Sequence, residues 1–274
     1  MRRLIVVIAA CFACATAGAA CPGGGVNAGL KASTADLLDC LHNPDPELRD
    51  ATGFTALQTR MRSKGVDTAG LHAIRTRLLA TLRNPDPTGF AQPFAALVLA
   101  EVVRADRVAP FLAAPERNEL VRAGSTWLEG VRDYRGFDQA EGWRHGVAHG
   151  ADLMLQLAVN PAITKAEHEL MLAAIAAQVA PAGTHFYRYG EGERLMAPVF
   201  YLARRDTISE AQWETWFARV AAPQAGPVTD ASLARKHNLK GFLYPLYASL
   251  SESRDAAQRA RLLPIVTRVL QQLD

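Results

Sequence analysis

The sequence predicts an all-α protein, built as a HEAT-like array of antiparallel helix pairs (an α-solenoid). Helix-forming Ala, Leu, Arg, Glu and Gln dominate the chain, and β-branched runs are rare. Helix start and stop signals recur at close intervals. The motif LxNPDP occurs at 41–46 and again 41 residues later at 82–87, with a weaker echo at 157–161. An offset near 40 is typical of two-helix repeats, although N-P-D-P also serves any all-α protein as a helix stop followed by a start.

The individual helices follow from their local signals. Pro46 and Pro115 suit first helical positions, and Thr164 with Glu167 forms a capping box. The expected helices cover residues 34–42, 46–63, 68–83, 90–105, 116–132, 141–158, 164–179, 192–204, 209–220, 238–251 and 255–272. No strand is expected, and the Pro- and Gly-rich stretches 181–184 and 222–230 are expected to be loops.

The N-terminal 20 residues have the pattern of a secretory signal peptide. Arg2 and Arg3 precede an apolar run over 4–15, which ends in small residues. That run is too short to span a bilayer. We therefore expect an exported protein, periplasmic or secreted, with a flexible tether at 21–33, one helical domain at 34–274 and no transmembrane helix in the mature chain.

Two cysteines remain after the expected cleavage. Cys21 and Cys40 are candidates for a disulfide in an exported protein. Alternatively, Cys21 stands where a lipoprotein carries its lipid, although Gly18 occupies the position where Leu is expected. The formal net charge is only +3, and Lys and Arg are scattered among Asp and Glu, so no nucleic-acid footprint is visible.

The segment 133–152, DYRGFDQAEGWRHGVAHGAD, concentrates the polar chemistry of the chain. In a helix over 141–158, His145, His149 and Asp152 share one face. Two imidazoles and a carboxylate suit a divalent transition metal such as zinc, but the Glu of an HExxH motif is missing. The alternatives are a structural hydrogen-bond network and a pocket for a ligand other than a metal. Glycines at 142, 146 and 150 would form a stripe that a neighbouring helix approaches closely.

A second polar cluster, YRYGEGER, lies at 187–194. Glu191 and Glu193 suit the start of a helix, and they become candidate catalytic carboxylates if the fold turns them towards His145. His185 and His237 are weaker candidates. The residues expected to line a pocket are Asp133, Arg135, Asp138, Trp143, His145, His149, Asp152 and Arg194.

Several motifs together resemble the bacterial domain-of-unknown-function family 2785. They are Arg49-Asp50 with FTAL at 54–57, PFAALVLAEV from Pro93 with Asp106-Arg107, the segment 133–152, and GEGERL from Gly190. The resemblance covers about Leu37 to Trp216. It implies a bacterial all-helical protein, and it supplies no established catalytic residues.

Two functions fit these observations. The first is a binding or scaffold module that holds a protein or a small polar ligand at a His/Asp pocket. The second is a metal-dependent hydrolase with His145, His149 and Asp152 as ligands and Glu191 or Glu193 as general base. The hydrolase requires a glutamate to reach the His pair around an open cleft, whereas the scaffold requires only a closed helix crossing.

Overall fold

The computed structural model describes residues 21–223 and 226–273, so the expected signal peptide at 1–20 lies outside the described residues. The prediction of a mostly helical protein is confirmed. The helices are α1 (Gly25–Gly29), α2 (Thr34–Cys40), the π-helix η1 (Glu47–Thr55), α3 (Ala56–Arg62), α4 (Thr68–Arg83), α5 (Ala91–Val108), α6 (Ala114–Gly130), α7 (Gly146–Ala158), α8 (Lys165–Val179), α9 (Glu191–Leu202), α10 (Glu210–Val220), α11 (Asp230–Glu252) and α12 (Ala256–Leu273).

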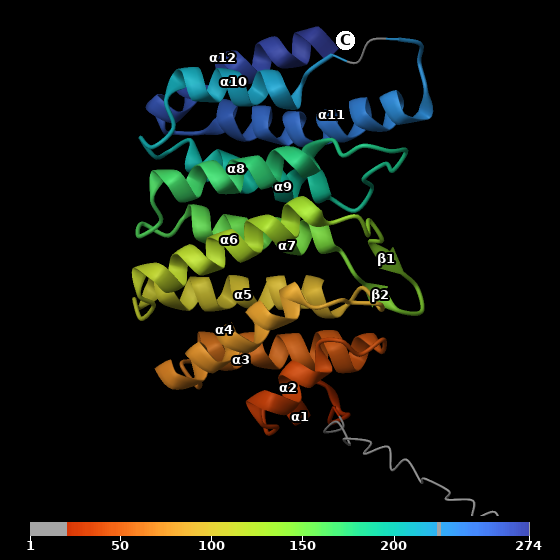
Figure 1. Cartoon of the computed structure of the whole chain (residues 1–274), viewed down its shortest axis with the longest axis vertical. Coiled ribbons are helices and arrows are strands. Elements are labelled where there is room, and N and C mark those ends of the chain that lie inside the picture. The colour runs from red at the N-terminus through yellow and green to blue at the C-terminus, as the bar shows by residue number, and fades with distance from the viewer. Residues whose placement is uncertain (1–20, 224–225, 274) are drawn as a thin grey trace, which may run out of the picture.

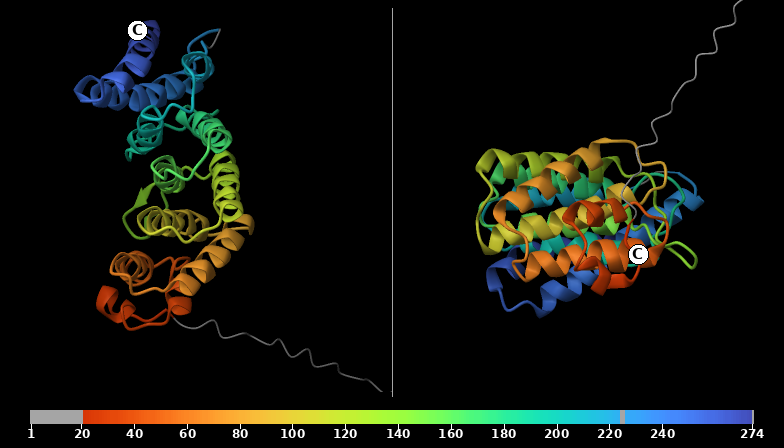
Figure 2. Two further views of the ribbon diagram at one scale, coloured as in Figure 1. Left: turned by 90° about the vertical axis from the view of Figure 1, so that its left-hand side faces the viewer. Right: turned by 90° about the horizontal axis from the view of Figure 1, so that it is seen from below.

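The helices stack in two layers along the long axis of the molecule (Figure 1). Helices α4, α6, α8, α10 and α12 contact one another in turn, and α5, α7, α9 and α11 do the same in the second layer. The stack is bowed, with α5, α7 and α9 on its inner side and α4, α6 and α8 on its outer side (Figure 2). The chain therefore alternates between the two layers, and the connecting loops lie at two opposite edges of the stack (Figure 1).

Apolar side chains between the layers form a continuous core. Helix α5 is buried over most of its length, as its apolar sequence predicts. Helix α7 approaches α6 closely at Gly150, where an added Cβ would lie 2.7 Å from a methyl carbon of Leu128. The expected close helix approach therefore exists at Gly150, while Gly142 lies outside the helix.

A small hairpin replaces the first turn of the helix expected at 141–158. Strands β1 (Phe137–Asp138) and β2 (Gly142–Trp143) pair antiparallel, so the prediction of no strand is wrong. The N–H groups of Arg144 and His145 extend this pairing by donating to carbonyl oxygens of residues 136 and 135. Gly142 and His145 have φ angles of 72° and 55°, which a right-handed helix excludes. Helix α7 consequently begins at Gly146.

Two other segments also differ from expectation. Helix α11 begins at Asp230 rather than near 238, because the Thr229 hydroxyl accepts a hydrogen bond from the N–H of Ser232 and caps it. The segment 21–33, expected to be a flexible tether, contains α1, which packs against η1 and α3. Residues 21–33 are therefore part of the fold.

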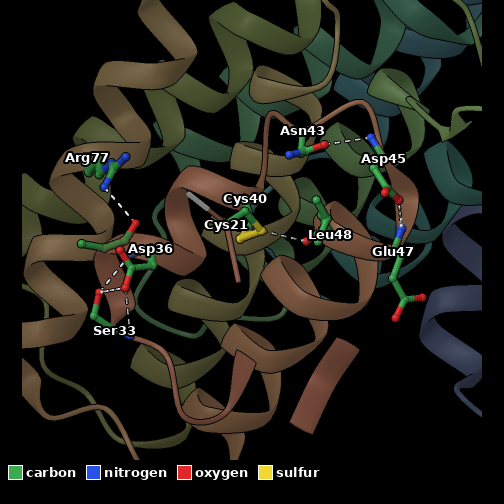
Figure 3. The surroundings of a disulfide bond; sticks show 10 residues. Cys21, Ser33, Asp36, Cys40, Asn43, Asp45, Glu47, Leu48 and Arg77 are labelled. Carbon is green, nitrogen blue, oxygen red and sulfur yellow. Dashed lines mark hydrogen bonds between the residues drawn. A yellow bond between two sulfur atoms is a disulfide. The ribbon is translucent and has the colours of Figure 1, made fainter. Parts of the chain in front are cut away.

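A disulfide joins Cys21 to Cys40, with the two Cα atoms 5.1 Å apart (Figure 3). It links the segment before α1 to the end of α2. In the following turn, Asp45 accepts a hydrogen bond from the N–H of Glu47 at 2.9 Å, and η1 begins there. The disulfide thus holds together the N-terminal end of the stack, formed by α1, α2, η1 and α3.

None of the helices within residues 21–223 and 226–273 combines the length and the apolar character that crossing a bilayer requires.

Removing the disulfide should destabilise this end of the stack. The bond spans a sequence separation of 19 residues. A loop of that size predicts that the double variant Cys21→Ser/Cys40→Ser loses about 3 kcal/mol of unfolding free energy. Urea denaturation followed by circular dichroism measures this loss. Wild-type protein in a reducing agent should match the variant, and an unchanged denaturation midpoint would contradict the prediction.

Candidate functional site

The segment 133–152 folds as the hairpin followed by the first half of α7. Aromatic rings cover His145 on the hairpin side: Trp143 stacks on it with ring centroids 4.7 Å apart. Tyr189 and Phe137 in turn contact Trp143, with centroid distances of 5.6 Å and 5.0 Å. The hairpin therefore acts as an aromatic lid over the start of α7.

Beneath this lid lies a buried polar cluster formed by His145, His149 and Glu191. The two imidazole centroids are 5.8 Å apart, and His145 Nε2 lies 3.8 Å from Glu191 Oε1. The other oxygen of Glu191 accepts a hydrogen bond from the N–H of Tyr189. His149 packs edge-on against Phe94. Within the described residues, His145 Nε2 and His149 Nδ1 have no hydrogen-bond partner.

Burial keeps both imidazoles neutral at neutral pH. Desolvation, followed by the nearby His145 and Arg194, lowers the pKa of His149 to about 3. Desolvation also lowers the pKa of His145, while the Glu191 carboxylate opposes this shift. A neutral imidazole tolerates an unpaired nitrogen far better than a charged one does.

Asp152 does not join the histidines. Its carboxylate binds Arg194 through both oxygens, at 2.7 Å and 2.6 Å. Burial raises the pKa of Asp152, and the Arg194 guanidinium opposes this shift. Across the described ranges, no group of three or more His, Cys, Asp or Glu side chains is arranged to hold a metal ion. The expected ligand set of His145, His149 and Asp152 is not assembled, because the Asp152 carboxylate pairs with Arg194.

The two candidate glutamates are placed differently. Glu191 is only 2% exposed and reaches His145, whereas Glu193 is exposed on the surface of α9. The gap bounded by His145, Glu191 and Tyr187 is too small for a water molecule. The cluster is therefore a closed crossing of α7 and α9.

The comparisons with known proteins bear on this same region. The model of the family described as "Protein of unknown function (DUF2785)" matches residues 78–248. The chain belongs to this family. No curated protein and no solved structure matched it.

The DUF2785 match confirms the family resemblance, and it contains the hairpin, the buried cluster and the segment 187–194. It begins within α4 and ends in α11, so Arg49 and the N-terminal helices α1, α2, η1 and α3 lie outside it. The hairpin and its surroundings thus fall inside the family-defining part of the chain.

Beside the hairpin lies an open cavity of about 520 Å³, which we call the hairpin pocket. Its walls include the side chains of Tyr134, Arg135, Phe137, His185, Arg188 and Tyr189. His185 stacks on Tyr134 with centroids 5.2 Å apart, and its Nε2 has no partner among the described residues. Arg188 forms no ion pair with any residue that the structure describes. The pocket therefore presents aromatic faces and a free guanidinium, while His185 Nε2 is buried in its wall.

Only part of this pocket was expected from the sequence. Arg135 and Asp138 line it, whereas Trp143, His149, Asp152 and Arg194 do not. Tyr134, Arg188 and Tyr189 were missed, and His185 was only a weak candidate. The density of Tyr and Arg at 187–194 was the available signal.

Several expected residues have structural roles at the pocket's edge. Arg135 pairs with Asp133 at 2.5 Å rather than with Asp138, which accepts hydrogen bonds from the N–H groups of Ala140 and Glu141 in the hairpin turn. His237, the other weak candidate, bonds the carbonyl oxygen of Tyr187 at 2.9 Å. These contacts hold the two loops that enclose the pocket.

The depressed pKa of His149 predicts a pH dependence of stability. Between the ordinary value of 6.5 and about 3, the unfolded chain binds a proton that the folded chain rejects. Stability should therefore fall as pH decreases through this window, by about 1.4 kcal/mol per pH unit from this group. Urea denaturation at pH 7, 6, 5 and 4 should show a shallower slope for His149→Phe. The exposed control His42→Gln should keep the wild-type slope, and equal slopes for all three proteins would refute the assignment.

Gly136 is required for the position of the Tyr189 ring. An added Cβ would lie 2.0 Å from Tyr189 Cδ2. Gly136→Ala must displace the ring, and we expect a loss of about 1–3 kcal/mol of unfolding free energy. Gly130→Ala is the matched control, because nothing lies within 4 Å of its Cβ position. Comparable denaturation curves for the two variants would show that Tyr189 moves freely.

Proposed function

We propose that this protein is an exported helical-repeat binding module whose ligand site is the hairpin pocket. The ligand class that fits is a small polar molecule with a ring and an anionic group. Aromatic walls accept the ring, and the Arg188 guanidinium accepts the anion. The cavity volume of about 520 Å³ lies within the range of small-molecule sites.

A recurring contact offset supports the HEAT-like array. Asp152 binds Arg194 at a separation of 42 residues, and Trp216 donates to the carbonyl of Leu172 at a separation of 44. Arg75 donates to the carbonyl of Glu116 at a separation of 41. Similar offsets in both layers are what stacking of two-helix units produces.

The disulfide supports export. Cysteine pairs persist in oxidising compartments and are rare in reducing ones. Together with the signal-like N-terminus, this favours a periplasmic or secreted location. A lipid anchor on Cys21 is less well supported, because its sulfur is bonded to Cys40.

The observation that carries the binding proposal is the unpaired guanidinium of Arg188 beside the aromatic walls of the pocket. Some surface guanidiniums in this fold are paired, as in Arg194 with Asp152 or Arg268 with Glu214. Arg188 has no such partner within the described ranges, and it lines a pocket with the rings of Tyr134 and Tyr189. An anionic ligand would pair with this guanidinium.

A metal-dependent hydrolase is the second candidate, because Glu191 reaches His145. Three observations weigh against it. The cluster has no space for a water, Asp152 is committed to Arg194, and Glu191 is held by the N–H of Tyr189. The buried cluster therefore fits a support for the hairpin better than a reaction centre.

Ligand-induced stabilisation tests the proposal. We would screen uronic acids, sugar phosphates and nucleoside monophosphates by thermal denaturation. A ligand at 100 times its dissociation constant stabilises by about 2.7 kcal/mol, or roughly 5–10 °C for a chain of this size. The shift should disappear in Arg188→Gln and persist in Arg219→Gln, a control at an exposed arginine on α10. A panel without any shift, or a shift unchanged in Arg188→Gln, would overturn the proposal.

A further inference from the structure

A second cavity of about 810 Å³ lies on the outer layer, and we call it the α6 groove. It runs along α6 between the end of α4 and the start of α5. Leu82, Pro93 and Val131 contribute to its floor, Trp127 forms a wall, and Arg122 and Arg132 stand at its rim. We infer that the α6 groove binds an extended acidic peptide segment, with two carboxylates facing the two rim arginines.

The first argument is an imbalance of charge. The acidic side chains of the groove are satisfied from within the protein: Glu119 binds Arg75 and Arg83, and Asp133 binds Arg135. Asp86, the remaining carboxylate, accepts hydrogen bonds from the N–H groups of residues 89 and 92. Arginines of the protein thus neutralise two of the three carboxylates, and backbone N–H groups hold Asp86, which forms no ion pair with a described residue.

The rim arginines lack this compensation. Arg122 donates to the neutral side chain of Asn118 at 2.7 Å. Arg132 donates to the carbonyl oxygens of Glu129 and Val131. Neither forms an ion pair with a described residue, and both are exposed. The two guanidinium groups at the rim are therefore available to form ion pairs with the carboxylates of a bound peptide.

The spacing of the two arginines defines the partner's geometry. From Arg122 to the end of α6 at Gly130 the helical rise gives about 12 Å, and Arg132 follows two residues later. An extended polypeptide covers that distance in four or five residues. Carboxylates at the first and fifth positions of a strand-like peptide would therefore reach both rim charges.

The groove floor favours a peptide over an anionic polysaccharide. The Trp127 indole N–H already donates to Gln92 at 3.0 Å, so its ring offers mainly an apolar face. Leu82, Pro93 and Val131 are also buried and apolar. Apolar side chains between the two acidic residues would pack on this floor, whereas sugar hydroxyls would lose hydrogen bonds to water there.

This inference does not rest on the hairpin pocket. The Asp133–Arg135 ion pair lies over Gly89 and separates the two cavities: a Cβ at Gly89 would lie 2.5 Å from Asp133 Oδ2 and 2.8 Å from Arg135 Nη2. The cavities share Arg144 in their linings, but Arg122 lines only the α6 groove and Arg188 only the hairpin pocket, so Arg122→Gln and Arg188→Gln test the two proposals separately.

The experiment is fluorescence anisotropy with fluorescein-labelled Glu-Leu-Val-Leu-Glu, Gln-Leu-Val-Leu-Gln and a linear polyuronate. We expect the acidic peptide to bind more tightly than the neutral one. Arg122→Gln and Arg132→Gln should each weaken binding by about five- to tenfold, and the double variant should abolish it. Arg219→Gln and Arg188→Gln should bind as wild type does.

Three outcomes would overturn the inference. They are equal binding of the acidic and neutral peptides, binding that is unaffected by both rim substitutions, and preferential binding of the polyuronate. The last would mark the groove as a polysaccharide surface. Because both rim arginines are exposed, the variants should melt as wild type does, and circular dichroism checks this.

Discussion

The buried guanidinium of Arg49 is the contact on which the hairpin and its surroundings depend. Arg49 is fully buried within η1, and it donates to the carbonyl oxygens of Asn43, Pro44 and Glu141. It also lies over the Phe90 ring at 4.2 Å, and the Arg144 guanidinium lies over the same ring at 4.1 Å. One desolvated cation thus joins the N-terminal helices, the start of α5 and the hairpin. A π-helix such as η1 often occurs at a functionally or structurally specialised position.

The contacts of Arg49 explain how the open hairpin pocket and the closed polar cluster lie side by side. The contacts of Glu141 and Arg144 fix the position of the hairpin, and the hairpin places Trp143 over His145. The imidazoles are thereby sealed and neutral, while Tyr134 and Tyr189 are left facing the pocket on the other side. The unpaired nitrogens of the cluster are a cost of this arrangement, and α7 and α9 offset it by close apolar packing.

How far the sequence predicts this structure depends on whether the deciding contacts are local. Helix α4 occupies the predicted range 68–83, and α8 and α10 begin one residue from theirs, because their caps lie in neighbouring residues. Residues 141–145 have the same helical appearance, yet they form a strand and a left-handed turn. The contacts that decide this, from Arg49 to Glu141 and between Phe137 and Trp143, are invisible to local patterns. The sequence predicts a contact between Glu191 and His145 only as one of two alternatives, because this contact depends on how α9 stacks beside α7.

The same stacking places the hairpin pocket at one edge of the stack rather than on its inner face. Neighbouring inner helices run parallel, as the His145–Glu191 and Asp152–Arg194 contacts show, so α7 and α9 begin at the same edge. The loops that enter these helices, at 131–145 and 180–190, are longer than those that leave α5 and α7, at 109–113 and 159–164. Long loops tolerate the irregular backbone that pockets need. The two cavities accordingly flank the loop at 131–145, and their shared neighbour is the Asp133–Arg135 pair. Because Arg49 holds the loop at 131–145 and His145 in it contacts Glu191 of α9, a substitution in this loop alters the pocket and the packing of the helices together.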